Sequence, residues 1–314
     1  MGKYLVRRLL WIVVVIFCVS VITFALSFLM PADPAKSIAG THATPEVLAR
    51  IRHDLGLDKP VYVQYVVYLW HLLHFNLGFS YVTQQPVFTS IMQRFPATVM
   101  VALFGIVFEL LIGIPIGMIS ALKQYSFRDR AFTVFNLLGI AAPGFWLGLI
   151  MLYLLAFQLP NAGINIFPLG GYGGWTHPIN GVLPGLTLGI GGAAWYSRML
   201  RSSMLDILNA DYVRAARAKG LPERIVVGRH IMRNAIGPIV TLLGMDVGWF
   251  LSGVLVIEVV FGIPGIGWQA WQAIQTSDIP MIMGTVQFSA ILIVLSNLVV
   301  DVAYTWLDPR VKYS

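Results

Sequence analysis

The sequence predicts an all-α integral membrane protein with six transmembrane helices and both termini in the cytoplasm. Of its 314 residues, 57% are hydrophobic and only 11% are charged, which is more apolar surface than a soluble core of this size needs. The apolar residues fall into six long segments, and the basic residues concentrate in alternate loops. Helices are expected because lipid offers no hydrogen-bond partner to open strand edges.

Each of the six segments approaches the roughly 20 helical residues that cross about 30 Å of hydrocarbon. The fourth is rich in glycine and has the least defined ends. The six segments are Leu9–Met30, Thr98–Ala121, Ala131–Leu159 (interrupted by Pro143 and Gly144), Gly181–Tyr196, Ala235–Val260 and Met281–Leu307.

The first segment follows Lys3, Arg7 and Arg8 and could be either a retained span or a cleaved signal peptide. Its apolar run is longer than a signal-peptide core, and Met30-Pro31-Ala32-Asp33 is a poor cleavage site, so we predict a retained span. The single cysteine, Cys18, lies within it, which leaves no intrachain disulfide.

The basic residues orient the helices. The N-terminus, residues 122–130, residues 197–234 and the C-terminus together hold 16 Lys and Arg, whereas the opposite loops hold 5. Positive charge marks the cytoplasmic side of a membrane protein. The net charge of +7 is therefore interpreted as a topology signal and not as a nucleic-acid surface.

Three regions follow from this topology. Residues 1–30 form the cytoplasmic N-terminus and first helix, residues 31–97 an extracytoplasmic segment, and residues 98–314 a core membrane domain that contains the cytoplasmic loop 197–234. In the extracytoplasmic segment, Thr44-Pro45-Glu46 has the pattern of a helix start. The apolar stretch at residues 61–73 is too short to span, and we expect it either to lie at the membrane interface or to pack on the spans.

Several kinds of chemistry are not indicated. There is no G-x-x-x-x-G-K-[ST] phosphate loop, so we expect no nucleotide hydrolysis in this chain. His71 and His74 have helical spacing, but they lack a Cys or acidic companion, which favours interfacial histidines over a metal site. No nucleophile elbow or Ser/His/Asp set is found. We therefore expect neither an enzyme nor a cofactor or metal in this chain.

Four acidic residues lie in or near apolar spans: Glu109, Asp246, Glu258 and Asp301. An ionised group at bilayer depth costs at least about 2.5 to 3.5 kcal/mol, so each should face protein or water. For Glu109 and Asp301 a structural pair is favoured over a role in translocation. For Glu258 a structural pair and a role in translocation are about equally supported, because this residue precedes a loop of unusual composition.

That loop contains glycine or proline at four of six positions, from Gly262 to Gly267. Such a sequence permits non-helical backbone near the membrane, where protein or water must cover it. A gate or re-entrant element and a plain surface turn followed by a short helix fit almost equally well. The candidate pathway or gate residues are Asp246, Glu258, Phe261, Pro264 and Gly265.

Residues 211–234 carry six Arg or Lys residues and have the pattern of two short helices with a break. Asp211 suits a helix start and Gly220 a helix end, with Pro222 starting the second helix. Tyr212, Ala215, Ala216 and Lys219 share a face at spacings of three and four residues. The two alanines at the centre of this face permit a partner to approach the helix backbone closely, which favours docking into a groove. The basic residues favour binding to anionic lipid equally well.

The sequence resembles the permeases of binding-protein-dependent ABC importers, and more narrowly the first of the two permeases in dipeptide, oligopeptide and nickel importers. The resemblance rests on several motifs along the whole chain: KYLVRRLL, DLGLDKPVYVQY, RFPATVMVAL, DYVRAARAKGL with RHIMRNAIGPIVT, EVVFGIPGIG and DVAYTWLDPRVKYS. Arg214 stands where the general EAA-loop pattern has Glu, and no Leu-Pro follows Gly220 at the expected spacing; the peptide-importer branch is similar in both respects. Pro31-Ala32-Asp33-Pro34 replaces the frequent Pro-Gly-Asp-Pro.

The resemblance implies a bacterial or archaeal inner-membrane protein with four kinds of partner: a second permease, two ATPase subunits that bind ATP and Mg, an extracytoplasmic binding protein, and membrane lipid. It implies alternating access, in which a coupling helix in the EAA loop docks on an ATPase subunit. Short peptides are the expected cargo, with nickel complexes or oligosaccharides as alternatives. An ion-coupled secondary transporter is the rival of a different class. The implied coupling residues are Asp211, Tyr212, Arg214, Ala215, Ala216, Arg217, Lys219, Gly220 and Leu221.

Overall fold

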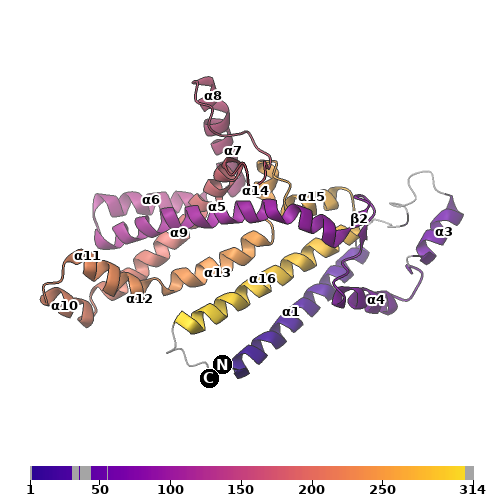
Figure 1. The fold of residues 1–314 in the computed structure, drawn as a ribbon, viewed down its shortest axis with the longest axis horizontal. Helices are drawn as coiled ribbons and strands as arrows, with labels where there is room; N and C mark the ends of the chain where they lie inside the picture. The colour runs from indigo at the N-terminus through magenta and orange to yellow at the C-terminus, as the bar shows by residue number, and fades with distance from the viewer. Residues whose placement is uncertain (1, 30–34, 36–43, 55, 308–314) are drawn as a thin grey trace.

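The structure is a computed structural model that describes residues 2–29, 35, 44–54 and 56–307. It confirms the all-α class, with one two-stranded hairpin (Figure 1). The elements are α1 (Gly2–Leu29), α3 (Pro45–Asp54), α4 (Val61–Leu73), β1 (Phe79–Ser80), β2 (Gln85–Pro86), α5 (Val87–Leu122), α6 (Phe127–Ala141), α7 (Gly144–Met151), the π-helix η1 (Leu152–Gln158), α8 (Leu159–Asn161), α9 (Ile179–Leu208), α10 (Asp211–Ala218), α11 (Glu223–Ile225), the π-helix η2 (Val226–Met232), α12 (Arg233–Ala235), α13 (Gly237–Leu251), α14 (Leu255–Val260), α15 (Ile266–Gln275) and α16 (Ile279–Leu307).

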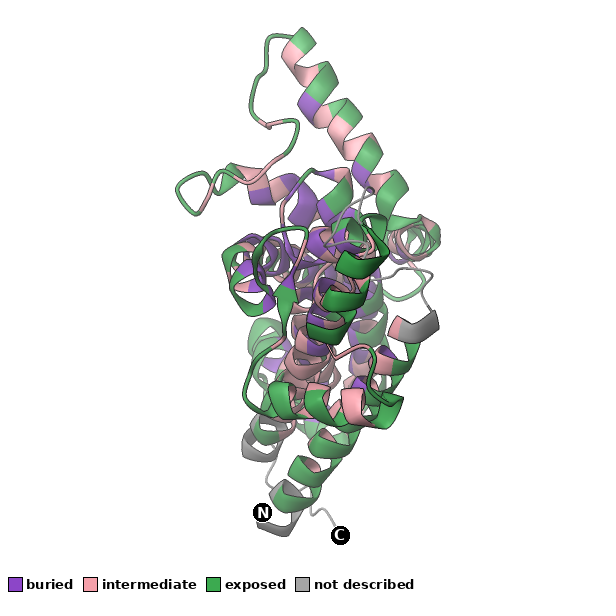
Figure 2. Ribbon diagram, turned by 90° about the vertical axis from the view of Figure 1, so that its right-hand side faces the viewer, coloured by how far each residue is buried: buried purple, intermediate pink, exposed green. Residues whose placement is uncertain are grey.

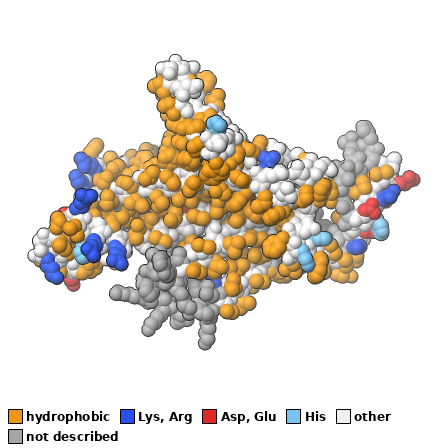
Figure 3. Space-filling model, viewed as in Figure 1, with side chains coloured by type: hydrophobic (Ala, Val, Ile, Leu, Met, Phe, Trp, Pro, Cys, Tyr) orange, Lys and Arg blue, Asp and Glu red, His pale blue; other side chains and the backbone are white. Residues whose placement is uncertain are grey.

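The long helices α1, α5, α9, α13 and α16 run along the length of the molecule (Figure 1). The start of α1 and the end of α16 lie toward the same end as α10 to α12, whereas α3, α4 and α15 lie toward the other. Basic side chains gather at the α10–α11 end and hydrophobic side chains cover the middle (Figure 3). This arrangement agrees with the predicted topology, because the start of α1, the end of α16 and the basic residues of α10 to α12 lie toward one end of the molecule.

Helices α5 and α9 pack extensively against each other, and glycines permit this close packing. A Cβ atom at Gly185 or Gly189 of α9 would overlap the Cβ of Phe104 or Phe108 of α5. From the other side, a Cβ at Gly113 would lie 2.7 Å from the Cβ of Tyr196. Small residues let membrane helices approach closely and gain packing energy that lipid contacts would not give. Gly185 and Gly189 of the predicted fourth span therefore serve packing.

Adding a methyl group at Gly189 is expected to destabilise the protein. In Gly189→Ala the new carbon overlaps α5, at a cost of about 1 to 3 kcal/mol for an overpacked contact. Gly191 of the same helix is a matched control, because nothing lies within 4 Å of a Cβ there. Thermal unfolding in detergent should show a lower midpoint for Gly189→Ala than for Gly191→Ala. Equal midpoints would contradict the proposed packing role.

The predicted third span, Ala131–Leu159, is broken at Pro143 and Gly144, as the sequence predicts. Helix α6 ends at Ala141, and α7 begins after Pro143. Ala142 is extended, with ψ of 123°, because the residue before a proline is disfavoured in the helical region. The continuation through α7, η1 and α8 projects from the bundle, as both views show (Figures 1 and 2), and much of its surface is exposed.

The second, fourth and sixth predicted spans lie within α5, α9 and α16, and the first lies in α1 as far as the described residues extend. The fifth, Ala235–Val260, is wrong as one helix, because it is divided among α12, α13 and α14. The fourth extends to Leu208 in α9, and α13 ends at Leu251, before the separate helix α14. Four helical stretches of the described residues are long and apolar enough to cross a membrane, and a fifth is obtained if the pair Glu223–Ala235 and Gly237–Leu251, bent by 53°, is one span. The four are Val6–Ser27, Val87–Leu122, Gly144–Asn161 and Ile279–Val302.

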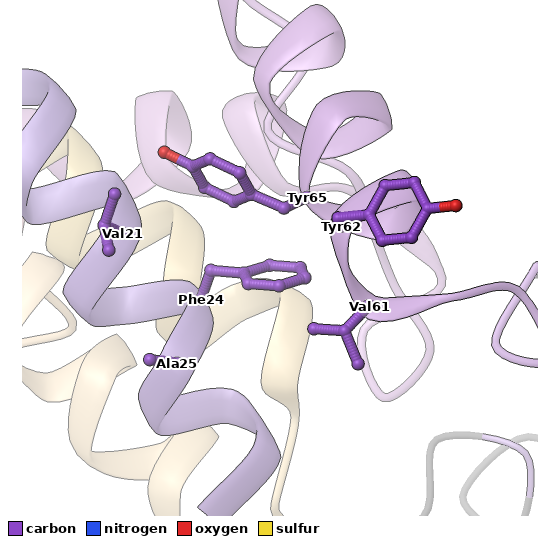
Figure 4. A pocket seen from close by; sticks show the side chains of 6 residues that line it. All are labelled: Val21, Phe24, Ala25, Val61, Tyr62 and Tyr65. Carbon is purple, nitrogen blue, oxygen red and sulfur yellow. The ribbon is translucent and has the colours of Figure 1, made fainter.

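Helix α4 packs against α1, one of the two placements predicted for this apolar helix. The hydroxyl oxygens of Ser20 and Tyr65 are 3.0 Å apart, and the rings of Phe24 and Tyr68 stack with centroids 5.8 Å apart. An apolar groove of about 720 Å³ remains between the two helices (Figure 4). Its lining residues are Val21, Phe24, Ala25, Val61, Tyr62 and Tyr65.

Candidate functional site

Helix α10 has the boundaries that the sequence predicts. It begins at Asp211, whose charge suits the positive end of a helix. It ends before Gly220, which has φ of 74° and is the kind of residue that accepts this left-handed conformation without strain. The amide of Gly220 donates to the carbonyl of Arg217 at 2.9 Å, and that of Leu221 to the carbonyl of Ala216 at 3.4 Å. These bonds satisfy carbonyl groups that the helix end would leave without partners.

The two faces of α10 have different environments. Val213 and Ala216 are buried in a hydrophobic cluster with Met204, Val226 and Ile231. The opposite side carries exposed Tyr212, Ala215 and Lys219, with Leu221 just beyond the helix. The sequence placed Ala215 and Ala216 together on one exposed face, and that placement is wrong for Ala216. Because it follows Val213 by three residues, Ala216 lies on the face that seats α10 against the bundle.

The basic residues of α10 also differ in their surroundings. Arg217 donates two hydrogen bonds to Glu223, of 3.1 and 2.7 Å, which tie the end of α10 to α11. Hydrogen bonding to this guanidinium lowers the pKa of Glu223. Arg214 and Lys219 are exposed, with Arg214 4.0 Å from Asp211. Of the three cations among the implied coupling residues, Arg217 is thus already paired within the chain.

A short continuous path connects α10 to the membrane helix α13. Asn234 of α12 donates to the Tyr212 hydroxyl at 3.2 Å, and Ser203 of α9 donates to the carbonyl of Ala235 at 3.0 Å. The π-helix η2 lies between α11 and α12, a feature the sequence pattern did not indicate. A displacement of α10 would therefore reach α13 through few residues and packed contacts.

The loop after α13 forms a second candidate site, around Glu258. This carboxylate is fully buried: it accepts from the Thr98 hydroxyl at 2.8 Å and from the Trp268 amide at 2.8 Å. The Thr98 oxygen in turn accepts from the Ile266 amide at 2.8 Å. Together the two side chains satisfy amides at the start of α15, where negative charge is favourable. Glu258 thus holds α15 against α5.

The other predicted gate residues surround this arrangement. A Cβ at Gly265 would overlap the Glu258 carboxyl group, so only glycine fits there without displacement. Phe261 is buried, and its carbonyl accepts from the Gly171 amide at 2.8 Å. Pro264 is half-buried between them. The loop between α14 and the short helix α15 is therefore packed against the bundle, and its role as a gate stays a prediction.

Two of the remaining acids form contacts between helices. Asp246 accepts from the Tyr196 hydroxyl at 2.6 Å, and Asp301 forms an ion pair with Arg8, the structural pairing favoured for it. The sequence analysis missed a third contact: Arg201 of α9 donates to Asp129 of α6 twice at 2.9 Å. Ser120 of α5 bonds to the same carboxylate. The sequence signal that could have indicated the Asp129–Arg201 contact is the presence of two charged residues in an otherwise apolar chain.

Comparison with known proteins gives consistent results over the whole chain. Residues 113–313 match the family model "Binding-protein-dependent transport system inner membrane component", and residues 1–102 match the model of the N-terminal part of such components. A Brucella abortus (strain 2308) protein described as a peptide transport system permease is 38% identical over 100% of both chains. The Salmonella typhi "Glutathione transport system permease protein GsiC" is 36% identical, again over 100% of both.

A solved structure shows the same fold. A chain of the MetNI methionine ABC transporter in an inward-facing conformation superimposes with a TM-score of 0.55. The match covers 69% of this chain and 96% of that one, with 15% sequence identity.

Proposed function

Because the chain belongs to the family of inner-membrane components of binding-protein-dependent transport systems, we propose that it is one of two permease subunits that import short peptides. It is a multi-pass inner-membrane protein and the permease component of an ABC importer. The peptide cargo is supported by the relatives described as peptide and glutathione permeases, since glutathione is itself a tripeptide. Nickel complexes and oligosaccharides are the alternatives, which these relatives' names do not favour.

The observation that carries the proposed mechanism is the two-sided environment of α10. One face is seated on the bundle through Val213 and Ala216, and the other is free to contact a partner through Tyr212, Ala215 and Lys219. We assign this outer face, with Arg214 and Leu221, to docking on an ATPase subunit. Asp211, Arg217 and Gly220 fix the ends of the helix. Because α10 is joined to α13 by packed contacts, movement of the docked helix biases the membrane helices between two arrangements.

The opposite end of the molecule would control access from outside. We assign Phe261, Pro264 and Gly265 to a gate that Glu258 holds in place, and Asp246 to the pathway beneath it. The extracytoplasmic segment, residues 31–97, with α3 and α4, would receive the binding protein. The core domain, residues 98–314, would form the pathway together with the second permease, and ATP hydrolysis would take place in the ATPase subunits.

The test is ATPase activity and uptake in proteoliposomes that contain this chain, its second permease, the ATPase subunits and the binding protein. Di- and tripeptides are expected to stimulate hydrolysis and to accumulate inside, whereas a nickel complex and an oligosaccharide have no effect. Stimulation by one of those two and not by peptides would overturn the proposed cargo. Uptake driven by an ion gradient without ATP would overturn the importer mechanism and favour a secondary transporter.

A further inference from the structure

A polar cluster lies inside the bundle, where α5, α9 and α13 meet. Glu109 comes from α5, Tyr196 from α9 and Asp246 from α13. The Tyr196 hydroxyl donates to Oδ2 of Asp246 at 2.6 Å. The Glu109 carboxyl lies against Gly192 of α9, where a Cβ would overlap it, and Asp246 is the charged neighbour that acts on it electrostatically. Two carboxyl groups from different helices therefore lie close to one tyrosine.

This cluster lacks a cation of its own. Within the described residues, no Lys, Arg or His pairs with Glu109 or Asp246, and Tyr196 is the one side chain that donates to Asp246. Glu109 is 2% exposed, and its Oε2 has no hydrogen-bond partner in the described part of the chain. A carboxylate in the membrane interior costs at least about 2.5 to 3.5 kcal/mol unless it is paired or hydrated. The Asp246 carboxylate, with Tyr196 as its one donor among the described residues, therefore has acceptor capacity left for a cation.

One stripe of α13 gives access to Asp246. Helix α13 packs against α16, α5 and α9, but the side chains of Met245 and Trp249 are 57% and 64% exposed. Asp246 lies beside them and is half-buried. An acid on a membrane helix faces protein or water and not lipid, so this stripe faces the pathway or the second permease. Trp249 follows Asp246 by three residues, which places the two side chains next to each other on the helix.

A carboxylate beside an indole ring is suited to an ammonium group. The carboxylate forms charge-assisted hydrogen bonds with N–H donors, and the indole face attracts a cation within about 6 Å. We propose that Asp246 and Trp249 bind an ammonium group of the cargo as it passes through the membrane. Tyr196 positions the Asp246 carboxylate. The inference rests on the proposed peptide cargo, because a peptide with a free N-terminus carries such a group.

The test compares uptake of trialanine and N-acetyl-trialanine by the reconstituted complex. Asp246→Asn is expected to lower the uptake ratio of free to acetylated peptide about tenfold, the loss of one charge-assisted contact. The binding protein's own preference cancels, because the same binding protein serves wild type and variant. Asp206→Asn is the matched control, because Asp206 is exposed near the C-terminal end of α9. This variant should leave the uptake ratio unchanged.

Two further variants separate recognition from a structural role. Tyr196→Phe and Trp249→Leu should raise KM for the free peptide more than for the acetylated one, in complexes that remain monodisperse. Equal losses for both peptides, or an unchanged ratio in Asp246→Asn, would overturn the ammonium site while the peptide importer stands. If wild type transports neither peptide, both the proposed function and this inference fail.

An inorganic cation could supply the same charge, and a salt series distinguishes the two sources. If an inorganic cation occupied the site at Asp246, uptake of both peptides by the wild type would rise with alkali-metal concentration at constant ionic strength. This dependence would be lost in Asp246→Asn. That outcome would overturn the assignment to the cargo. The proposal expects uptake to be independent of the alkali metal.

Discussion

Replacing Ala215 by aspartate is expected to separate the permease from its ATPase subunit while leaving the permease folded. Ala215 is exposed on the outer face of α10, so the new carboxylate is hydrated in the free chain. In the docked complex the same group would be buried without a partner. Disruption of a contact at the centre of an interface typically costs about 2 to 4 kcal/mol, or roughly 30- to 1,000-fold in affinity. Co-purification of the ATPase subunits and their peptide-stimulated hydrolysis measure the loss.

Two neighbouring substitutions complete this experiment. Ala215→Ser keeps the side chain small and uncharged and should retain assembly. Ala216→Asp should instead lower the stability of the permease itself, because Ala216 is buried against the cluster that seats α10. If Ala215→Asp retained both assembly and transport, the outer face of α10 would not be the docking surface.

Removing the Glu258 carboxylate is expected to release α15 from α5. In Glu258→Ala, the Trp268 amide and the Thr98 hydroxyl lose their acceptor in a buried site. Each buried polar group left without a partner costs about 1 to 3 kcal/mol. Glu258→Gln should lose less, since its amide oxygen still accepts from one of the two donors. Thermal unfolding and proteolysis at residues 261–278 are the measurements.

Thr98→Val provides the partner substitution for a double-mutant cycle with Glu258→Ala. Since the two side chains are bonded to each other, the double variant should be less destabilised than the sum of the single ones by about 0.5 to 3 kcal/mol. Full stability of Glu258→Ala, together with loss of transport, would contradict the structural role and assign Glu258 to the pathway.

The sequence predicts local features of this protein well. The start of α10 at Asp211 and its end before Gly220 depend on capping and backbone preferences of single residues, which act over a few positions. The long spans depend on runs of apolar residues and are visible for the same reason. Pro143 and Gly144 predict the interruption, but the direction of the chain after it depends on the contacts of α7 with α9 and α14.

The sites depend on contacts that no local pattern encodes. Glu258 meets Thr98 across 160 residues, and Asp129 meets Arg201 across 72. The inward position of Ala216 results from its alignment with Val213 against α9 and η2, and helical spacing alone groups it equally well with Ala215. The sequence does not indicate the packing function of Gly185 and Gly189, because that function depends on the facing surface of α5.

The central claim, that the outer face of α10 contacts an ATPase subunit, is tested most directly by site-specific crosslinking. The chain has one cysteine, Cys18, so a Cys18→Ser background gives a single thiol for each introduced cysteine. A thiol-to-amine crosslinker is applied to the assembled complex carrying Ala215→Cys or Ala216→Cys. We expect a crosslink from position 215 to an ATPase subunit and none from position 216. Absence of that product at position 215, or equal products at both positions, would contradict the assignment.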